Sequence, residues 1–409
     1  MKQVSFVTIL NQDGIKPCCA GFKIGDNYYI YDLYRTGVKR PIKEVKKSIS
    51  KINELLNKIN DTGSPIVTTG FKKLLGIYDL PIDDRDYNIY DLHIDINNPL
   101  VTVGSQSKDA ENIKNILDRF SKVTVKPYQK LLANASIVYK DLENTGFYVN
   151  DVLVHPQWSL DTFSGRSKSL GFNIQGHSEN DYFYTISNNR NSVLIHFDWI
   201  SADIRAASIL AKDDILARSF NESDPYTYMQ NIINAGQESD LIDRDECKLY
   251  LLKSINSMNV DTGAISDIYP KLCRWIYKCG EKTKEANGGL STILDRQFKV
   301  SRAKNTLAVL NGAMQGTVAH AMQNVMRQVW LSCKPYLLTD IHDSLVLSVP
   351  NERQVIRSAI KLVAPIMMHP FKGIIEHDHV FPLKVSIGTK WKNWKLYKTY
   401  RNDHDCEQS

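Results

Sequence analysis

The sequence predicts a chain of two parts, a mixed α/β domain followed by a larger α+β domain. Its 409 residues, 43% of them hydrophobic, are enough for two cores. Short apolar strands alternate with helical patterns over the first 125 residues, whereas later apolar runs are separated by long helical stretches. No internal repeat or low-complexity tract suggests another architecture.

The first domain, residues 1–125, begins with the runs VSFVTIL, CAGFKIG and NYYIYDLY, which read as strands. Apolar residues at helical spacing then predict a helix over Ile42–Ile59. The segments IVTTGFKKLLGI and NIYDLHI predict a further strand, helix and strand. This order is that of an α/β domain.

The second domain, residues 126–400, opens with a predicted helix over Tyr128–Glu143 that should stop at Asn144 and Gly146. The runs SVLIHF and SLVLSVP predict strands, with helices between them. The polar tail 401–409 is expected to be disordered.

Charge and cysteine content exclude some classes of protein. The net charge is only +6, but residues 271–304 carry nine basic and three acidic side chains. This stretch suits a surface for backbone phosphates, and a solvated helix face is the alternative.

Seven scattered cysteines, the lack of a secretion signal and the lack of a long apolar segment favour a reduced, cytoplasmic protein of a bacterium or a virus-infected host, with no membrane association.

Two aspartates carry the chemistry that we expect. Asp198 follows an apolar run and precedes a helical pattern, which puts it at the end of a strand. Asp343 lies in LLTDIHDSLVLSVP, where two apolar runs flank a polar tetrapeptide and predict a hairpin with the acid at its tip. If folding joins them, they can bind two Mg²⁺ ions, for which Mn²⁺ can substitute, because Mg²⁺ prefers charged oxygen ligands. Each aspartate alone would more commonly cap a turn.

The second domain contains six distinctive segments in order: SGRSKSLGFNIQG at 164–176, DWISADIR at 198–205, RDECK at 244–248, NGAMQGT at 311–317, IHDSLVLSVP at 341–350 and GTKWKNW at 388–394. Together they resemble the family A DNA polymerases, the group related to bacterial DNA polymerase I and phage T7 DNA polymerase. The resemblance covers about residues 130–396. The order of the six is far more specific than any one of them.

The resemblance implies a right-hand polymerase fold with a palm (150–204 and 305–400), fingers (205–304) and a reduced thumb, behind an RNase H-like 3′–5′ exonuclease-type domain. It also implies roles for individual residues. Asp198 and Asp343 would be the metal ligands; Arg244, Lys248, Asp203, Leu252 and Asn256 would bind the nucleotide; Arg166, Asn173, Gln175, Arg205, Asn311, Gln315 and His342 would contact DNA. Two cations four residues apart on a helix, as at 244 and 248, suit a triphosphate, although such pairs are also common on surfaces.

The chain departs from the family pattern in three places that concern the nucleotide. After RDECK it lacks the usual aromatic residue and Tyr-Gly pair, so stacking of the nascent base pair must differ. Asp203 stands where these enzymes usually carry Glu, and Ser344 follows Asp343 where Glu is usual. A side chain one methylene shorter leaves room for a 2′-hydroxyl, so we expect measurable but minor ribonucleotide incorporation.

Two further departures concern the thumb and the N-terminal domain. Only DVLVHPQWSLDTF lies between GFYVN and the segment at 164, too little for a helical thumb. We therefore expect low intrinsic processivity and a partner protein, or the N-terminal domain, that supplies grip on DNA. The exonuclease-like domain retains only Asp91 of the four acids required, and that residue is as well explained as a surface group, so no proofreading is expected.

The expected function is template-directed DNA synthesis from dNTPs on primer-template DNA. Asp203 and Ser344 keep open an RNA-synthesising or primer-making polymerase. The altered segment after RDECK and the short thumb keep open a replication scaffold that binds primer-template without catalysis.

Overall fold

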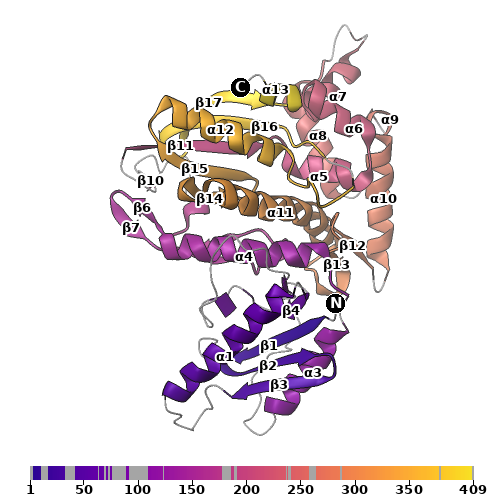
Figure 1. Ribbon diagram of the computed structural model, residues 1–409. Helices are drawn as coiled ribbons and strands as arrows, with labels where there is room; N and C mark the ends of the chain where they lie inside the picture. Colours follow the sequence, from indigo (N-terminus) through magenta and orange to yellow (C-terminus); the bar gives the residue numbers. More distant parts are fainter. Residues whose placement is uncertain are drawn as a thin grey trace. The chain divides into compact units, whose positions relative to one another are not determined.

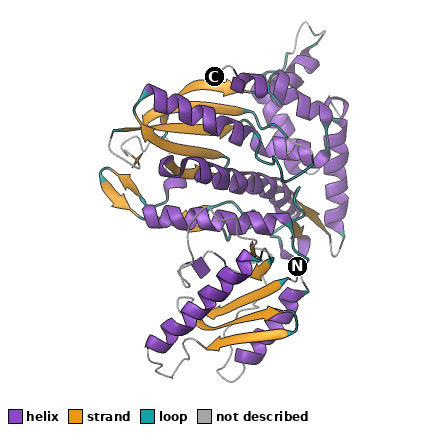
Figure 2. Cartoon of the chain, in the orientation of Figure 1, coloured by secondary structure: helices purple, strands orange, loops and turns teal. Residues whose placement is uncertain are grey.

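The computed structural model describes residues 3–10, 17–32, 42–62, 64–68, 71, 74–75, 89–91, 109–122, 124–176, 186–187, 191–235, 237, 241–257, 264–285, 288–376 and 379–407. The chain divides into two compact units, Met1–Asn144 and Thr145–Ser409. Figures 1 and 2 show the elements of each unit. None of the described helices is both long enough and apolar enough to cross a membrane.

Unit 1 contains a five-stranded mixed sheet in the order β3-β2-β1-β4-β5. Strand β2 is antiparallel to β1 and β3, β4 is parallel to β1, and β5 is parallel to β4. The strands are β1 (Val4–Leu10), β2 (Pro17–Ile24), β3 (Asn27–Asp32), β4 (Ile66–Thr68) and β5 (Ile89–Asp91), and the helices are α1 (Ile42–Asp61), α3 (Asp109–Ser121) and α4 (Pro127–Thr145). Most of the helix predicted after the strand at 66 lies outside the described residues.

Close packing of α3 on β2 depends on Gly21. A Cβ there would lie 2.4 Å from Cγ2 of Ile113 on α3, so any side chain would force the helix away from the sheet. On the sheet, the rings of Phe6 and Phe22 stack with their centroids 4.3 Å apart.

Asp91, at the end of β5, is a buried residue and not a surface one. Its side chain is 3% exposed, and Oδ2 accepts a hydrogen bond from the backbone N–H of Phe71 at 2.8 Å. A buried carboxylate is stabilised by such a bond, so Asp91 helps to hold the chain after β4 against β5.

Unit 2 is built on a five-stranded antiparallel sheet in the order β14-β15-β11-β16-β17 (Figure 1). The strands are β14 (Leu337–Ile341), β15 (Ser344–Pro350), β11 (Ser192–Trp199), β16 (Leu383–Lys390) and β17 (Asn393–Tyr400). One face of the sheet packs on α12 (Arg353–Met368), where the indole N–H of Trp199 donates to the Met367 carbonyl at 2.8 Å. Alternation along β11 therefore directs Asp198 to the other face.

Helices and short strands form the rest of unit 2 (Figure 2). The long helix α11 (Thr306–Cys333) is largely buried and packs against α5 and α12. Its first turn is capped by Asn305, whose side chain accepts from the N–H of Ala308 at 2.8 Å. The remaining helices before it are α5 (Ala202–Ala211), α6 (Asp214–Glu222), α7 (Pro225–Asn234), α8 (Arg244–Ser257), α9 (Ala264–Ile268) and α10 (Pro270–Lys284), followed by the hairpin β12 (Gly289–Ser291) and β13 (Gln297–Lys299).

The segment 150–165, where the sequence left no room for a helical thumb, contains strands and turns and no helix. It includes β7 (Val152–Val154), which pairs with β6 (Phe147–Val149), and β8 (Gln157–Ser159), which pairs with β9 (Lys168–Leu170). Gly146 has φ +65°, and a Cβ there would lie 2.4 Å from the Val154 carbonyl oxygen. This glycine ends α4 where the sequence predicted a stop.

Two boundaries differ from the expected ones. The division between the units follows α4, whereas the sequence analysis assigned this helix to the second domain. At the C-terminus, residues expected to be disordered form the short helix α13 (Asp403–Glu407). Asp405 explains the order, because its carboxylate accepts from the backbone N–H of Arg401 at 2.6 Å and its carbonyl accepts from Lys398 Nζ at 2.6 Å.

Candidate active site

Asp198 lies on β11 of the unit 2 sheet, and Asp343 lies in the turn just before β15, the strand that pairs with β11. Asp198 is within β11 and pairs directly with Ser344, the first residue of β15. Asp343 immediately precedes Ser344, and its carbonyl accepts from the N–H of Trp199 at 3.4 Å. Opposite residues in an antiparallel pair have Cα atoms about 5 Å apart, so Asp343, the neighbour of Ser344, lies near Asp198 although 145 residues separate the two acids in sequence.

The turn that carries Asp343 has an unusual backbone. His342 and Asp343 join β14 to β15, as the hairpin prediction required, and His342 has φ 59°. This left-handed conformation is uncommon for residues other than glycine, and it occurs here at the tip of the hairpin, directly before Asp343.

Burial and like charge raise the pKa of both acids. The pKa of Asp198 rises to about 7, first because of burial and then because of the charge of Asp343, with Lys384 acting in the opposite direction. Burial also raises the pKa of Asp343; Arg166 opposes this and Asp203 adds to it. Without a cation, two neighbouring buried carboxylates lower the stability of the fold. A divalent ion bound by them would lower their pKa values again.

The donor set fits Mg²⁺ that is also bound by substrate. Among the described residues no group of three or more His, Cys, Asp or Glu side chains is arranged to hold a metal. Two adjacent carboxylates are nevertheless what Mg²⁺ takes from a protein when water and substrate phosphates complete its six ligands. Asp198 and Asp343 are the residues that would hold it.

Asp203 and Arg166 form an ion pair beside these acids. Arg166 NH2 lies 3.0 Å from Asp203 Oδ1, and the side chains are 21% and 43% exposed. The Nε of Arg166 is buried and has no hydrogen-bond partner among the described residues. Burial raises the pKa values of Asp203 and Asp343 and lowers that of His342; Arg166 opposes the first two shifts and adds to the third, so it is near all three side chains.

Gln175 belongs to a buried network rather than to an open surface. Its Nε2 donates to Ser167 Oγ at 2.8 Å, and its Oε1 accepts from the Ser169 N–H at 3.1 Å. Ser167 in turn donates to Asp340 Oδ2 on β14 at 2.5 Å. Gln175 therefore fixes the segment 164–176 on β14, and contact with DNA would require these bonds to be exchanged. Asn173, two residues earlier, is exposed.

Arg205, expected at the DNA surface, is instead 5% exposed. Its guanidinium lies 5.3 Å from the ring centroid of Phe220, and NH1 donates to the Ala217 carbonyl at 3.3 Å. Arg205 consequently joins α5 to α6, and the assignment to DNA binding is corrected.

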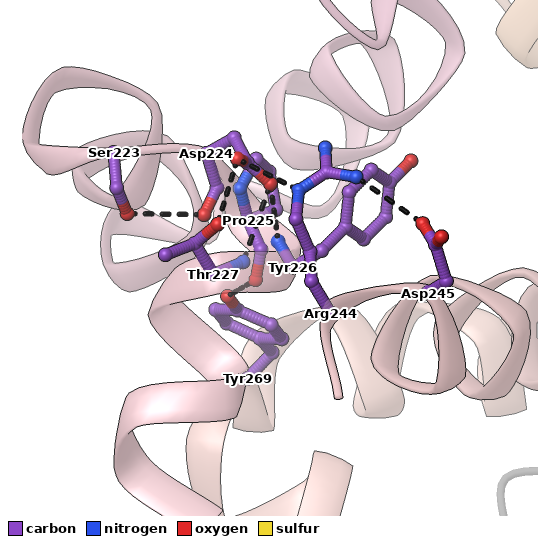
Figure 3. Close-up of polar contacts among 8 residues, drawn as sticks. All are labelled: Ser223, Asp224, Pro225, Tyr226, Thr227, Arg244, Asp245 and Tyr269. Atoms are coloured by element: carbon purple, nitrogen blue, oxygen red, sulfur yellow. Dashed lines mark hydrogen bonds and ion pairs between the residues drawn. The ribbon is translucent and has the colours of Figure 1, made fainter. Parts of the chain in front are cut away.

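Arg244, at the start of α8, is held by an acidic and aromatic cluster (Figure 3). Its Nε lies 3.2 Å from Asp224 Oδ2, and its guanidinium carbon is 5.2 Å from the ring centroid of Tyr226. Asp224 also caps α7, accepting from the N–H groups of Tyr226 at 3.0 Å and Thr227 at 3.2 Å. Burial raises the pKa of the Tyr226 hydroxyl, Ser201 lowers it and Asp203 adds to the rise, so this cluster reaches back toward Asp203.

The other expected nucleotide-binding residues follow Arg244 along α8. Lys248 and Asn256 are exposed and Leu252 is partly exposed, whereas Cys247, Leu251 and Ile255 are buried on the opposite side. On α11, Asn311 and Gln315 are one helical turn apart and partly exposed between buried neighbours. Each set thus shares one accessible helix face.

The basic stretch 271–304 is more heterogeneous than its composition suggested. Arg296 is buried, donates to the Phe163 carbonyl at 2.8 Å and lies over Phe298. Lys271 pairs with Asp214, and Lys284 with Glu281. Only part of the charge is therefore available to phosphates.

Residues that sequence reasoning missed also lie here. Lys384 is directly opposite Asp198 in the register of β11 and β16, and Trp394 stacks on His196 with ring centroids 4.5 Å apart. Burial, and then Lys392, lower the pKa of His196 to about 4, so its ring is neutral. The run of lysines and tryptophans at 384–394 was the available signal.

No protein-family model matches the sequence, and no curated protein matches it. A solved structure with a similar fold is the POL domain of Pol1 from M. smegmatis in complex with DNA primer-template and dNTP. The TM-score is 0.58 at 12% sequence identity, with 95% of this chain and 96% of that chain covered. The protein therefore shares the fold of a DNA polymerase domain.

Proposed function

We propose that this protein is a template-directed DNA polymerase that extends a primer 3′-hydroxyl with dNTPs. The observation that carries the proposal is the nearness of Asp198, on the sheet face away from α12, to Asp343 in the turn before the paired strand β15. The fold in which they lie is shared with a DNA polymerase domain solved with primer-template and dNTP. Two Mg²⁺ ions held by these acids would activate the hydroxyl and steady the pyrophosphate leaving group.

The chain's own groups orient the substrates. We assign the α8 face of Arg244 and Lys248 to the triphosphate, because two cations on one helix face can bind its oxygens. We assign Asn311 and Gln315, together with Arg166, Asn173 and His342, to the primer-template, since amides can bond the minor-groove acceptors common to all base pairs. Leu252 and Asn256 then border the nascent pair.

Asp203 is the residue that we assign to sugar selection. Its ion pair with Arg166 fixes its carboxylate beside the acids of the site. A shorter acid than Glu leaves more room for a 2′-hydroxyl, which supports minor ribonucleotide incorporation.

The few acids of unit 1 support the proposal that it is an inactive exonuclease-type domain. The strands of segment 150–165 support the proposal of low processivity. The one candidate acid in unit 1, Asp91, bonds to the Phe71 backbone, and the strand β1 carries no acid. The strands of 150–165 offer no helical hairpin to grip a duplex, so a partner protein would be needed for long synthesis. A trap-DNA challenge tests this, and long products from one binding event would contradict it.

The deciding experiment is primer extension with a defined template and dNTPs, comparing the wild type with Asp198→Asn and Asp343→Asn. Template-complementary extension by the wild type alone supports the proposal. Binding of primer-template without extension would identify a scaffold. Synthesis from rNTPs without a primer would identify a primer-making polymerase.

A further inference from the structure

We infer that three buried side chains, those of Ser167, Gln175 and Asp340, position Arg166 against Asp203 and so set how strongly the site discriminates between deoxyribonucleotides and ribonucleotides. These three side chains, the Arg166 anchor, are positioning residues that act through Arg166. The inference rests on the proposed function for the identity of the substrate.

The position of Asp203 depends on Arg166. The Asp203 side chain is 43% exposed, and its bond with NH2 of Arg166 at 3.0 Å is its only side-chain hydrogen bond among the described residues. Arg166 in turn is bound only at this far end of its guanidinium, because its Nε has no partner in the described part of the chain. The backbone that carries Arg166 therefore decides where both side chains lie.

This backbone is fixed on both sides of Arg166. Before it, the Gly165 carbonyl accepts from Nε2 of Gln323 on α11 at 3.0 Å. After it, Oγ of Ser167 donates to Oδ2 of Asp340 on β14 at 2.5 Å. The segment is thus attached to a helix and to the central sheet of unit 2 by bonds that flank the arginine directly.

The anchor is polar although it is buried. Ser167 and Gln175 are each 7% exposed and Asp340 is 2% exposed. Nε2 of Gln175 donates to Ser167 Oγ at 2.8 Å and to the Asp340 carbonyl at 3.3 Å. Burial of a carboxylate lowers stability unless hydrogen bonds offset the loss of water, whereas a hydrogen bond restricts distance and angle more than an apolar contact does. This composition suits precise placement of the segment.

Strand β14 connects the anchor to the metal-binding acids. Asp340 lies three residues before Asp343, so the strand that holds the segment of Arg166 also leads into the turn of Asp343. A displacement of about 1 Å near reacting groups can change a rate by about a hundredfold. A small shift of Arg166 relative to this strand would consequently alter the space beside Asp203 where a 2′-hydroxyl lies.

The first test is single-nucleotide insertion on a defined primer-template, measured separately with dNTP and the matching rNTP. Ser167→Ala removes the hydroxyl that joins the anchor, and we expect the kcat/KM ratio of rNTP to dNTP to rise about fivefold. Ser167→Thr retains a hydroxyl and should keep the wild-type ratio. The matched control is Ser219→Ala, which removes another buried hydroxyl, one that donates to the Leu216 carbonyl at 2.7 Å.

Two results of this test overturn the inference. Equal losses with dNTP and rNTP in Ser167→Ala would show that the hydroxyl has a structural role alone. A ratio in Ser167→Thr that matches Ser167→Ala would show that the hydroxyl does not position Arg166. Urea unfolding curves check that each variant is folded.

The second test follows Arg166 itself by nuclear magnetic resonance and needs no enzymatic activity. Its Nε–H is buried, so it exchanges with water only when the side chain moves. The signal, assigned by its loss in Arg166→Lys, should exchange about tenfold faster in Ser167→Ala. It should exchange at the wild-type rate in Ser167→Thr and Ser219→Ala. Unchanged exchange in Ser167→Ala overturns the inference.

The outcomes separate the inference from the proposed function. If the wild type extends primers but Ser167→Ala changes neither readout, the anchor does not position Arg166 and the polymerase assignment stands. If exchange responds as expected but the wild type extends no primer, the proposed function fails while the anchoring of Arg166 is supported. Faster exchange with an unchanged nucleotide ratio in an active enzyme overturns the inference, because sugar discrimination then does not depend on the Arg166 anchor.

Discussion

Unit 1 and unit 2 each have acidic residues at the end of a strand, and the surroundings of these acids differ between the two units. In unit 1 the carboxylate of Asp91 is buried and satisfied by a backbone N–H. In unit 2 burial raises the pKa values of Asp198 and Asp343, and a neighbouring carboxylate adds to each shift, that of Asp343 for Asp198 and that of Asp203 for Asp343. A satisfied acid stabilises a fold, whereas crowded acids lower stability and are retained for what they bind.

Loss of one crowded acid should have the largest effect. Asp198→Asn or Asp343→Asn is expected to slow single-turnover primer extension by about a thousandfold, corresponding to roughly 4 kcal/mol of lost metal-dependent stabilisation. Their thermal midpoints measured without metal should equal or exceed that of the wild type, because a charge repulsion is removed. A lower midpoint would show that these acids, like Asp91, are structural.

Asp91→Ala should give the converse result. Removing the acceptor leaves the Phe71 N–H buried without its partner, which costs about 1–3 kcal/mol. Urea unfolding should show this loss, while primer extension at a permissive temperature stays within twofold of the wild type. Degradation of primer 3′ ends by the wild type that Asp91→Ala abolishes would mean that unit 1 is an active exonuclease.

Asp203→Glu sharpens the account of sugar selection. One added methylene beside the nucleotide should reduce the kcat/KM ratio of ribonucleotide to deoxyribonucleotide by about tenfold or more. Single-nucleotide insertion kinetics with paired dNTP and rNTP give the ratio directly. An unchanged ratio would remove Asp203 from the sugar site; Asp203→Asn controls for loss of the Arg166 ion pair at constant length.

The smallest effect concerns the cluster around Arg244. Asp224→Asn retains a helix cap for α7 but releases Arg244 from its ion pair, so the KM for dNTP should fall by less than about fivefold. Steady-state kinetics at saturating primer-template measure it. A rise in KM would mean that Asp224 positions Arg244 for the nucleotide instead of competing with it.

Local patterns predicted the elements of the site well. Alternating apolar runs around a polar tetrapeptide predicted the hairpin that carries Asp343, and the run before Asp198 predicted β11. Pairing of these strands is a long-range event that no local pattern encodes. It was expected only because the ordered motifs resemble a known family, and the fold similarity agrees with that expectation.

The fates of polar residues were harder to predict. Arginine and glutamine are typical of surfaces. Arg205 nevertheless packs over Phe220 and donates to the Ala217 carbonyl. The side-chain amide of Gln175 forms hydrogen bonds with Ser167 and Ser169. Their partners come from other segments or from turn geometry, which the sequence does not display. Lys384 was different, because its alternation with Val385 on a strand could have indicated an exposed face beside Asp198.

Metal stoichiometry tests the central claim most directly. The measurement is a titration of Mn²⁺, followed by electron paramagnetic resonance, into the protein bound to a 3′-deoxy-terminated primer-template and the correct dNTP. The account predicts two bound ions per wild-type protein, fewer in Asp198→Asn and Asp343→Asn, and two in the control Asp91→Asn. Two ions retained after either substitution in the crowded pair would contradict it.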